Sequence, residues 1–253
     1  MNDAGAGFYA RKQLSSASAL IAWSHRRRYE TALRHARRFA GQRVLDFGCG
    51  DGTFLAMLMA DPSRPASAVG TDMARDAIED CRKRYDGVPD LIFLPTDELM
   101  ASMDTQAYDG VICMEVLEHA VDLAAVLDQL VALLAPGGRL LVSVPVETGL
   151  PLLVKQTVRR VAGWRGIGDY PGITPYTWRQ LMSGVVAGGH WHIPRPVHRA
   201  ADGSPFHDHK GFNWMALRRA LADRLQVEAV YASPVSWLPP HLASQAWFVA
   251  RRD

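Results

Sequence analysis

The sequence has few cysteines, little net charge and no long apolar run, and each of these features excludes a class of protein. Its three cysteines, Cys49, Cys81 and Cys113, are far apart and form no CxxC pair, so we predict neither a zinc ribbon nor a disulfide framework. The net charge of +2 is too small for a protein that neutralises many phosphates, so no nucleic-acid partner is expected. No apolar run approaches the ~20 residues of a membrane-spanning helix, and we expect a cytoplasmic protein.

What the sequence does contain is an alternation of short apolar runs with amphipathic segments. Strands are predicted over 44–47, 68–71, 91–94, 110–114 and 139–144, with helices over 53–60, 75–85, 98–102 and 121–134. Strands that are buried on both faces and joined by helices form a parallel, doubly wound sheet, so the fold class is α/β. A helix over 213–223 and strands over 226–232 and 246–251 follow. The short loop between these two strands requires antiparallel pairing.

Composition divides the chain into three parts. We predict a helical lead-in over 1–40, an α/β domain over 41–145 and 212–253, and an inserted lid over 146–211 that is rich in aromatic residues and histidine. Within the lead-in, residues 25–39 form an amphipathic helix with many arginines. We favour packing beside the first strand for this helix over contact with a membrane surface or an acidic partner.

A glycine-rich turn follows the first strand, at residues 44–53 (VLDFGCGDGT). Its glycines let the backbone approach a ligand closely, and the next helix begins with unpaired N–H groups that attract an anion. A dinucleotide site would favour glycine at position 53, which is Thr53. Asp46 would repel a pyrophosphate but suits an ammonium group. The ligand is therefore expected to carry a carboxylate and an amine together.

Two more acidic residues follow the next strands. Asp72 ends the second strand, where a carboxylate receives the two hydroxyls of a ribose. Asp97 follows the third strand, where it suits an adenine amino group. Each aspartate alone is better explained as a helix cap, but their succession after strands one, two and three favours one ligand. A ligand with an amino-acid end, a ribose and an adenine is S-adenosylmethionine.

Residues 44–144 resemble class I S-adenosylmethionine-dependent methyltransferases, through residues 44–52, VGTD at 69–72, TD at 96–97 and LAPGGRLL at 134–141. Within that superfamily, YDGVICMEVLEH at 108–119 resembles the ubiquinone-biosynthesis O-methyltransferases and their type 11 relatives. The resemblance implies a seven-stranded, mostly parallel sheet of order 3-2-1-4-5-7-6 with the last strand antiparallel. The expected cofactor-binding residues are Asp46, Gly48, Cys49, Gly50, Asp72, Met73, Asp97 and Glu115.

Candidate catalytic groups follow the fourth strand and recur in the insertion. If a helix begins after that strand, Glu115, Glu118 and His119 share one face. The resemblance implies a divalent cation held by this trio; His119 is alternatively a lone general base, or the three residues only line the cofactor pocket. His207 and His209 are further base candidates, which we favour over a zinc site in the insertion. No metal ligand is assigned.

An apolar stripe with flanking basic residues over 150–165 has two interpretations. We favour a lid helix over the acceptor site, and the alternative is peripheral contact with the inner membrane surface.

The expected function is methyl transfer from S-adenosylmethionine to a small or lipid-like acceptor, with oxygen favoured as the acceptor atom. The alternatives are transfer to nitrogen or carbon without a protein base, and a catalytically silent S-adenosylmethionine-binding regulatory or scaffold protein. The sequence predicts no particular oligomeric state.

Overall fold

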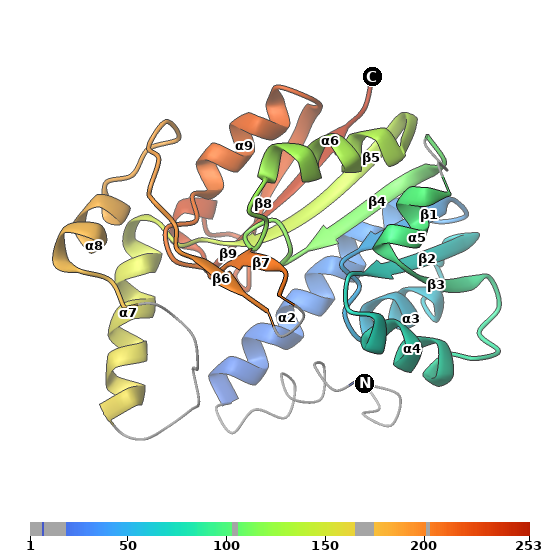
Figure 1. The fold of residues 1–253 in the computed structure, drawn as a ribbon, viewed down its shortest axis with the longest axis horizontal. Helices are drawn as coiled ribbons and strands as arrows, with labels where there is room; N and C mark the ends of the chain where they lie inside the picture. The colour runs from blue at the N-terminus through green and yellow to red at the C-terminus, as the bar shows by residue number, and fades with distance from the viewer. Residues whose placement is uncertain (1–6, 8–18, 103–105, 165–174, 201–202) are drawn as a thin grey trace.

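The computed structural model describes residue 7 and residues 19–102, 106–164, 175–200 and 203–253. The rest of the predicted lead-in and the middle of the predicted lid lie outside the described residues, as do the side chains of 19–21 and 160–164. The described part is built around one twisted sheet with helices on both faces (Figure 1).

The central sheet has seven strands in the order β3-β2-β1-β4-β5-β9-β8. Strand β9 runs antiparallel to both β5 and β8, whereas the pairs from β3 to β5 are parallel. Counting only the strands of this sheet, the predicted order and the antiparallel last strand are confirmed. The bounds are β1 (Arg43–Phe47), β2 (Ser67–Asp72), β3 (Leu91–Pro95), β4 (Tyr108–Met114), β5 (Leu134–Pro145), β8 (Gln226–Ser233) and β9 (Gln245–Arg251).

Two hydrophobic clusters cover the two faces of the sheet, because consecutive strand residues point to opposite sides. Leu45 belongs to one cluster and Val44 to the other. The Leu45 face is covered by α5 (Thr96–Ala101), α6 (Leu123–Leu133) and α9 (Trp214–Ala222). The Val44 face is covered by α2 (Ala19–Ala36), α3 (Thr53–Met59) and α4 (Arg75–Arg84).

Two predicted element boundaries are wrong, and the helix considered directly after β4 does not form. The first long helix begins at Ala19, six residues before the predicted start, and ends in a 3-10 turn, η2 (Arg37–Phe39). No helix begins directly after β4: residues 117–119 form a turn, and α6 starts at Leu123, where the carboxylate of Asp122 accepts a hydrogen bond from the third residue of the helix. Strand β5 extends back to Leu134, because Gly137 and Gly138 pair with Arg252 near the chain end.

The insertion is more regular than its sequence suggested. It contains α7 (Gly149–Trp164), α8 (Trp178–Val185) and a hairpin of β6 (Val197–Arg199) with β7 (Pro205–His207). Helix α8 begins with a capping box between Thr177 and Gln180, a signal that is readable in the sequence. A short 3-10 helix, η3 (Pro240–Leu242), precedes β9. Among the described helices, none has both the length and the apolar character required to cross a bilayer.

Candidate active site

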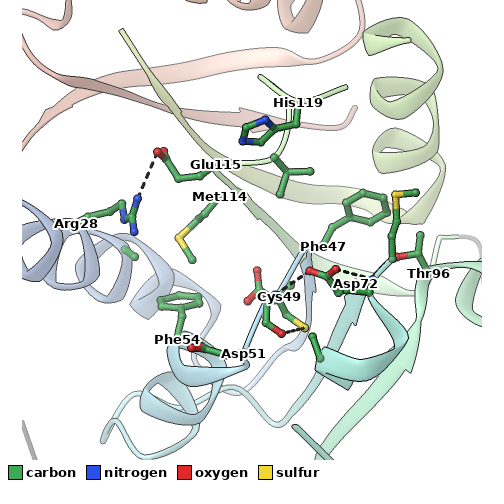
Figure 2. Close-up of a pocket in the computed structure, with 18 of the residues that line it drawn as sticks. Arg28, Phe47, Cys49, Asp51, Phe54, Asp72, Thr96, Met114, Glu115 and His119 are labelled. Atoms are coloured by element: carbon green, nitrogen blue, oxygen red, sulfur yellow. Dashed lines mark hydrogen bonds and ion pairs between the residues drawn. The ribbon is translucent and has the colours of Figure 1, made fainter. Parts of the chain in front are cut away.

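A cavity of about 470 Å³ opens where β1, β2 and β4 end, which is the edge at which open α/β sheets bind ligands (Figure 2). Seven of the eight predicted cofactor-binding residues line it, and Asp97 is the exception. His119 also lines the cavity, whereas His207 and His209 do not. The lining residues are Arg28, Tyr29, Ala32, Asp46, Phe47, Gly48, Cys49, Gly50, Asp51, Phe54, Asp72, Met73, Ala74, Ala77, Thr96, Met114, Glu115, Val116 and His119.

The glycine turn forms the floor of the cavity. Gly48 has a φ of 80°, in the left-handed region, and its N–H donates to the carbonyl of Thr71 at 2.7 Å. A Cβ atom at this position would lie 2.3 Å from Cγ2 of Val116. Only glycine satisfies both the conformation and the space, and the bare backbone lets a ligand approach closely.

Asp46 lies beneath this turn and is 1% exposed. Its Oδ1 atom has no hydrogen-bond partner among the described residues. Burial, with a smaller contribution from the charge of Asp72, raises the pKa of Asp46 to about 8. A buried carboxyl oxygen without a donor is the counterpart that an ammonium group requires, so the site fits the amino-acid end of S-adenosylmethionine.

Asp72 ends β2 and points its carboxylate at the glycine turn, accepting hydrogen bonds from the N–H groups of Gly50 at 3.0 Å and Ala74 at 2.9 Å. It lies at the cavity end away from His119 and Glu115 (Figure 2).

Asp97, unlike Asp46 and Asp72, does not line the cavity. Its side chain is 69% exposed and forms an ion pair with Arg75, while the preceding Thr96 lines the cavity. The adenine-binding role of Asp97 stays a prediction.

Helix α2 supplies a wall of the cavity that sequence reasoning missed. Nη1 of Arg28 lies 3.4 Å from Oε2 of Glu115, and Tyr29 lies beside it. A guanidinium here suits the carboxylate of the cofactor's amino-acid end. The only signal in the sequence was the position of Arg28 next to the apolar stripe of the helix.

Glu115 is held as a charged group. Its φ of 56° is unusual for a residue other than glycine, and Oε1 accepts a hydrogen bond from Oγ of Ser143 at 2.9 Å. Burial alone would raise the pKa of Glu115. The positive charge of Arg28, then His209 and the hydrogen bonds from Ser143 and Gln245, outweigh burial and hold that pKa below its usual value.

His119 has a defined orientation. Its Nδ1 atom lies 2.8 Å from the carbonyl oxygen of His207, and the N–H of His207 donates to the carbonyl of His119 at 3.0 Å. Because a carbonyl only accepts, we infer that Nδ1 carries the hydrogen, which makes Nε2 the proton acceptor of the neutral ring. The side chain of His207 is engaged elsewhere, with Nδ1 2.7 Å from the carbonyl of Pro196.

Glu118 and His209 complete the group around His119. The rings of His119 and His209 meet edge to face at 4.9 Å. Glu118 is fully buried, and neither of its carboxyl oxygens has a hydrogen-bond partner in the described part of the chain. Burial, followed by the charge of Glu115, raises the pKa of Glu118 well above its usual value.

These three residues could also hold a metal ion, because their ligand atoms lie within 4.8 Å of one another. The set differs from the predicted trio: His209 from the insertion takes the place of Glu115, which pairs with Arg28.

Comparison with known proteins identifies the class. Residues 22–221 match a family described as a methyltransferase domain. A ubiquinone biosynthesis O-methyltransferase from Aeromonas salmonicida is 40% identical over 105 residues, or 41% of this chain and 43% of that protein. Its counterpart from Bordetella pertussis is 41% identical over 106 residues, or 41% and 42% of the two chains. The matches thus span less than half the length of these relatives.

Solved structures agree on the fold. A protein from Pyrococcus horikoshii OT3 superposes with a TM-score of 0.60 at 15% identity, covering 96% of both chains. The N-methyltransferase NodS from Bradyrhizobium japonicum WM9 gives 0.52 at 18% identity, covering 90% of this chain and 96% of that one. The chain belongs to the methyltransferase domain family. Membership of this family agrees with the S-adenosylmethionine site that the glycine turn and the acidic residues of the cavity predict.

Proposed function

We propose that the protein transfers the methyl group of S-adenosylmethionine to a hydroxyl oxygen of a small or lipid-like acceptor, with His119 as the general base. The observation that carries this proposal is the hydrogen bond between Nδ1 of His119 and the carbonyl of His207, in a histidine that lines the cofactor cavity. The names of the relatives from Aeromonas salmonicida and Bordetella pertussis support oxygen as the acceptor atom.

The bound cofactor supplies a methyl group on a positively charged sulfur. An acceptor hydroxyl is a weak nucleophile until its proton is removed, and Nε2 of His119 can take that proton as the oxygen attacks. The resulting imidazolium keeps its hydrogen bond to the His207 carbonyl, with Oε1 of Glu118 3.9 Å from Nε2. The His119 side chain is 39% exposed, so the proton can then pass to water.

A second mechanism uses a divalent cation bound by Glu118, His119 and His209, whose donor atoms are close enough to share one ion. The two unpaired carboxyl oxygens of Glu118 favour this arrangement. A cation would lower the pKa of the acceptor hydroxyl, but it would occupy Nε2 of His119, since Nδ1 is already engaged. The two mechanisms therefore exclude each other and can be separated by experiment.

The test uses the purified protein, S-adenosylmethionine with a labelled methyl group, and a catechol that carries a short isoprenoid chain. The aniline analogue serves as the nitrogen acceptor. Replacing His119 by Ala is expected to lower transfer to the catechol by roughly 100-fold or more, with unchanged affinity for S-adenosylmethionine in calorimetry. Exposed His190 of the insertion provides the control, and His190→Ala is expected to keep full activity.

Two results would contradict the proposal. Equal methyl transfer by His119→Ala and the wild type would exclude His119 as the general base. Methylation of the aniline but not of the catechol would exclude oxygen as the acceptor atom. Loss of activity on dialysis against EDTA, restored by Mg²⁺ or Zn²⁺, would favour the metal mechanism over the free base.

A further inference from the structure

A partly buried arginine in the insertion, Arg195, joins two segments that are distant in the sequence. Nη2 of Arg195 donates hydrogen bonds to the carbonyl oxygens of Glu118 and of Asp208, the latter at 2.7 Å, and Nε donates to that of Lys210 at 3.3 Å. The guanidinium carbon also lies 5.3 Å from the centre of the Phe212 ring. One side chain therefore holds three backbone carbonyls and one aromatic face.

These carbonyls belong to the two segments that build the region around His119. Glu118 lies in the turn after β4, directly before His119. Asp208 and Lys210 flank His209, whose ring meets the ring of His119. The two hydrogen bonds between His119 and His207 join the same segments. Arg195 thus joins the same two segments as the His119–His207 hydrogen bonds that orient the His119 ring.

The chemistry of the guanidinium suits this position. It is planar, offers five N–H donors in a rigid arrangement and keeps its charge, so it can bridge several carbonyls at once. Burial lowers the pKa of Arg195 to about 10, which leaves the group charged at neutral pH. Lysine would carry the same charge but could not place donors on Glu118, Asp208 and Lys210 in one plane.

We propose that Arg195 is a positioning residue, whose guanidinium holds residues 207–210 of the insertion against the turn at 117–119 so that Nε2 of His119 faces the bound substrates. This inference rests on the proposed function of His119 as a base. Arg195 does not line the cofactor cavity, so it acts on the reaction through His119 and not through binding of S-adenosylmethionine.

The test compares Arg195→Ala and Arg195→Lys with a matched control, Arg199→Ala. Arg199 lies in the same insertion and also donates to a backbone carbonyl, that of Gly203, which lies within the same β6–β7 hairpin as Arg199 itself. Turnover is measured with labelled S-adenosylmethionine and the isoprenoid catechol, cofactor affinity by calorimetry, and contact between the segments by hydrogen exchange of the His207 amide.

We expect Arg195→Ala to lower kcat roughly 100-fold, because small misplacements of a catalytic group cost about that factor, and to keep cofactor affinity within about twofold. Millimolar methylguanidinium should restore part of the kcat of this variant and none of that of His119→Ala. Arg195→Lys should fall between Arg195→Ala and the wild type, and Arg199→Ala should match the wild type.

The inference is overturned if Arg195→Ala turns over within twofold of the wild type, or if its loss of activity only follows a loss of cofactor affinity and resists methylguanidinium. Should Arg195→Ala fail to fold, the same criteria apply to Arg195→Lys. If the wild type methylates no hydroxyl, the proposed function fails first. The His207 amide then decides the role of Arg195: faster exchange in its variants than in Arg199→Ala supports the contact, and equal exchange refutes it.

Discussion

Nη1 of Arg28 lies 3.4 Å from Oε2 of Glu115, an ion pair that joins helix α2 to the segment directly after β4 at the wall of the cofactor cavity (Figure 2). The two side chains are 14% and 21% exposed, so water screens the pair only in part. The pair connects α2, a helix that precedes the first strand of the sheet, to the wall of the cofactor cavity. It also explains why a largely buried carboxylate stays ionised.

Removing the Arg28 cation should therefore deprive Glu115 of its strongest stabilising partner, leaving His209 and the hydrogen bonds from Ser143 and Gln245. We expect Arg28→Ala to lower the free energy of unfolding by about 1–3 kcal/mol at pH 7 and to weaken binding of S-adenosylmethionine. Because the pKa of folded Glu115 is lowered, its contribution to stability is present above the unfolded pKa and is lost as the pH falls through the folded pKa. The variant should consequently lose less stability on acidification.

Calorimetric unfolding between pH 3.5 and pH 7 measures this difference. The control is Arg27→Ala, since the neighbouring Arg27 pairs with Glu30 at the exposed surface, where an ion pair contributes little. A similar pH dependence for the Arg28 variant and the wild type would contradict the assignment.

Binding of S-adenosylmethionine should depend on the ionisation of Asp46. Burial and the charge of Asp72 raise the pKa of this residue to about 8, whereas an ammonium group beside it favours the carboxylate. Affinity is therefore expected to rise between pH 6 and pH 7.5, with uptake of the proton by the buffer. Titration calorimetry in buffers of different ionisation enthalpy detects that proton. Asp46→Asn should bind S-adenosylmethionine more weakly than the wild type and show no rise in affinity with pH. Constant affinity of the wild type between pH 6 and pH 7.5 would refute the prediction.

The two aspartates that follow β2 and β3 should differ in importance. Asp72 lines the cavity, whereas Asp97 is exposed beside Arg75. Asp72→Asn is expected to weaken cofactor binding by about 1.5–3 kcal/mol, the range for hydrogen bonds to charged groups. Asp97→Asn should change it less than twofold. An equal loss in the two variants would show that Asp97 approaches the adenine when the cofactor binds.

Gly48→Ala should be more damaging than alanine at another left-handed glycine. Gly41 has a φ of 68° with nothing within 4 Å of an added Cβ, so Gly41→Ala costs only the conformational strain of about 1–2 kcal/mol. At Gly48 the contact with Val116 adds to that strain. Thermal unfolding should rank the variants accordingly, and Val116→Ala should recover part of the loss at Gly48. Equal costs at the two glycines would exclude the Val116 contact as the cause.

Membrane contact through residues 150–165 stays a prediction, but the structure supports it through the exposed apolar residues of α7 and not through the flanking basic residues. Lys155 and Arg159, expected to flank the apolar stripe, pair instead with buried Glu147 at 2.9 and 3.6 Å. The exposed feature of α7 is the stripe itself: the relative exposure of Val154 is 55% and that of Val158 is 51%.

Co-sedimentation with vesicles tests the stripe. If α7 contacts lipid, Val154→Glu combined with Val158→Glu should abolish sedimentation with anionic vesicles without lowering the melting temperature. Val186→Glu serves as the control, because Val186 lies just beyond α8 and is more exposed to solvent than Val154 or Val158. Absence of wild-type binding would remove the membrane interpretation of the stripe.

The floor of the cofactor cavity could be predicted because its parts are local. Asp46, Gly48 and Asp72 lie within or directly after short apolar strands, and parallel strands bring their carboxyl ends to one edge of the sheet. Arg28 was missed because the angle at which α2 crosses the sheet depends on packing against β8 and α3, which no local pattern records. The condition that a helix begins after β4 is not met, because residues 117–119 form a turn, which the spacing of Glu115 and His119 fits equally well.

The sequence alone determined the doubly wound sheet and the glycine turn, since strand burial and the left-handed backbone of Gly48 depend on residues that are neighbours in the chain. Only the tertiary structure decided which nitrogen of His119 is the proton acceptor and which group keeps Glu115 charged. Both depend on atoms of His207 and Arg28 that folding brings near, and such hydrogen bonds and charges act through distances in space of a few ångströms.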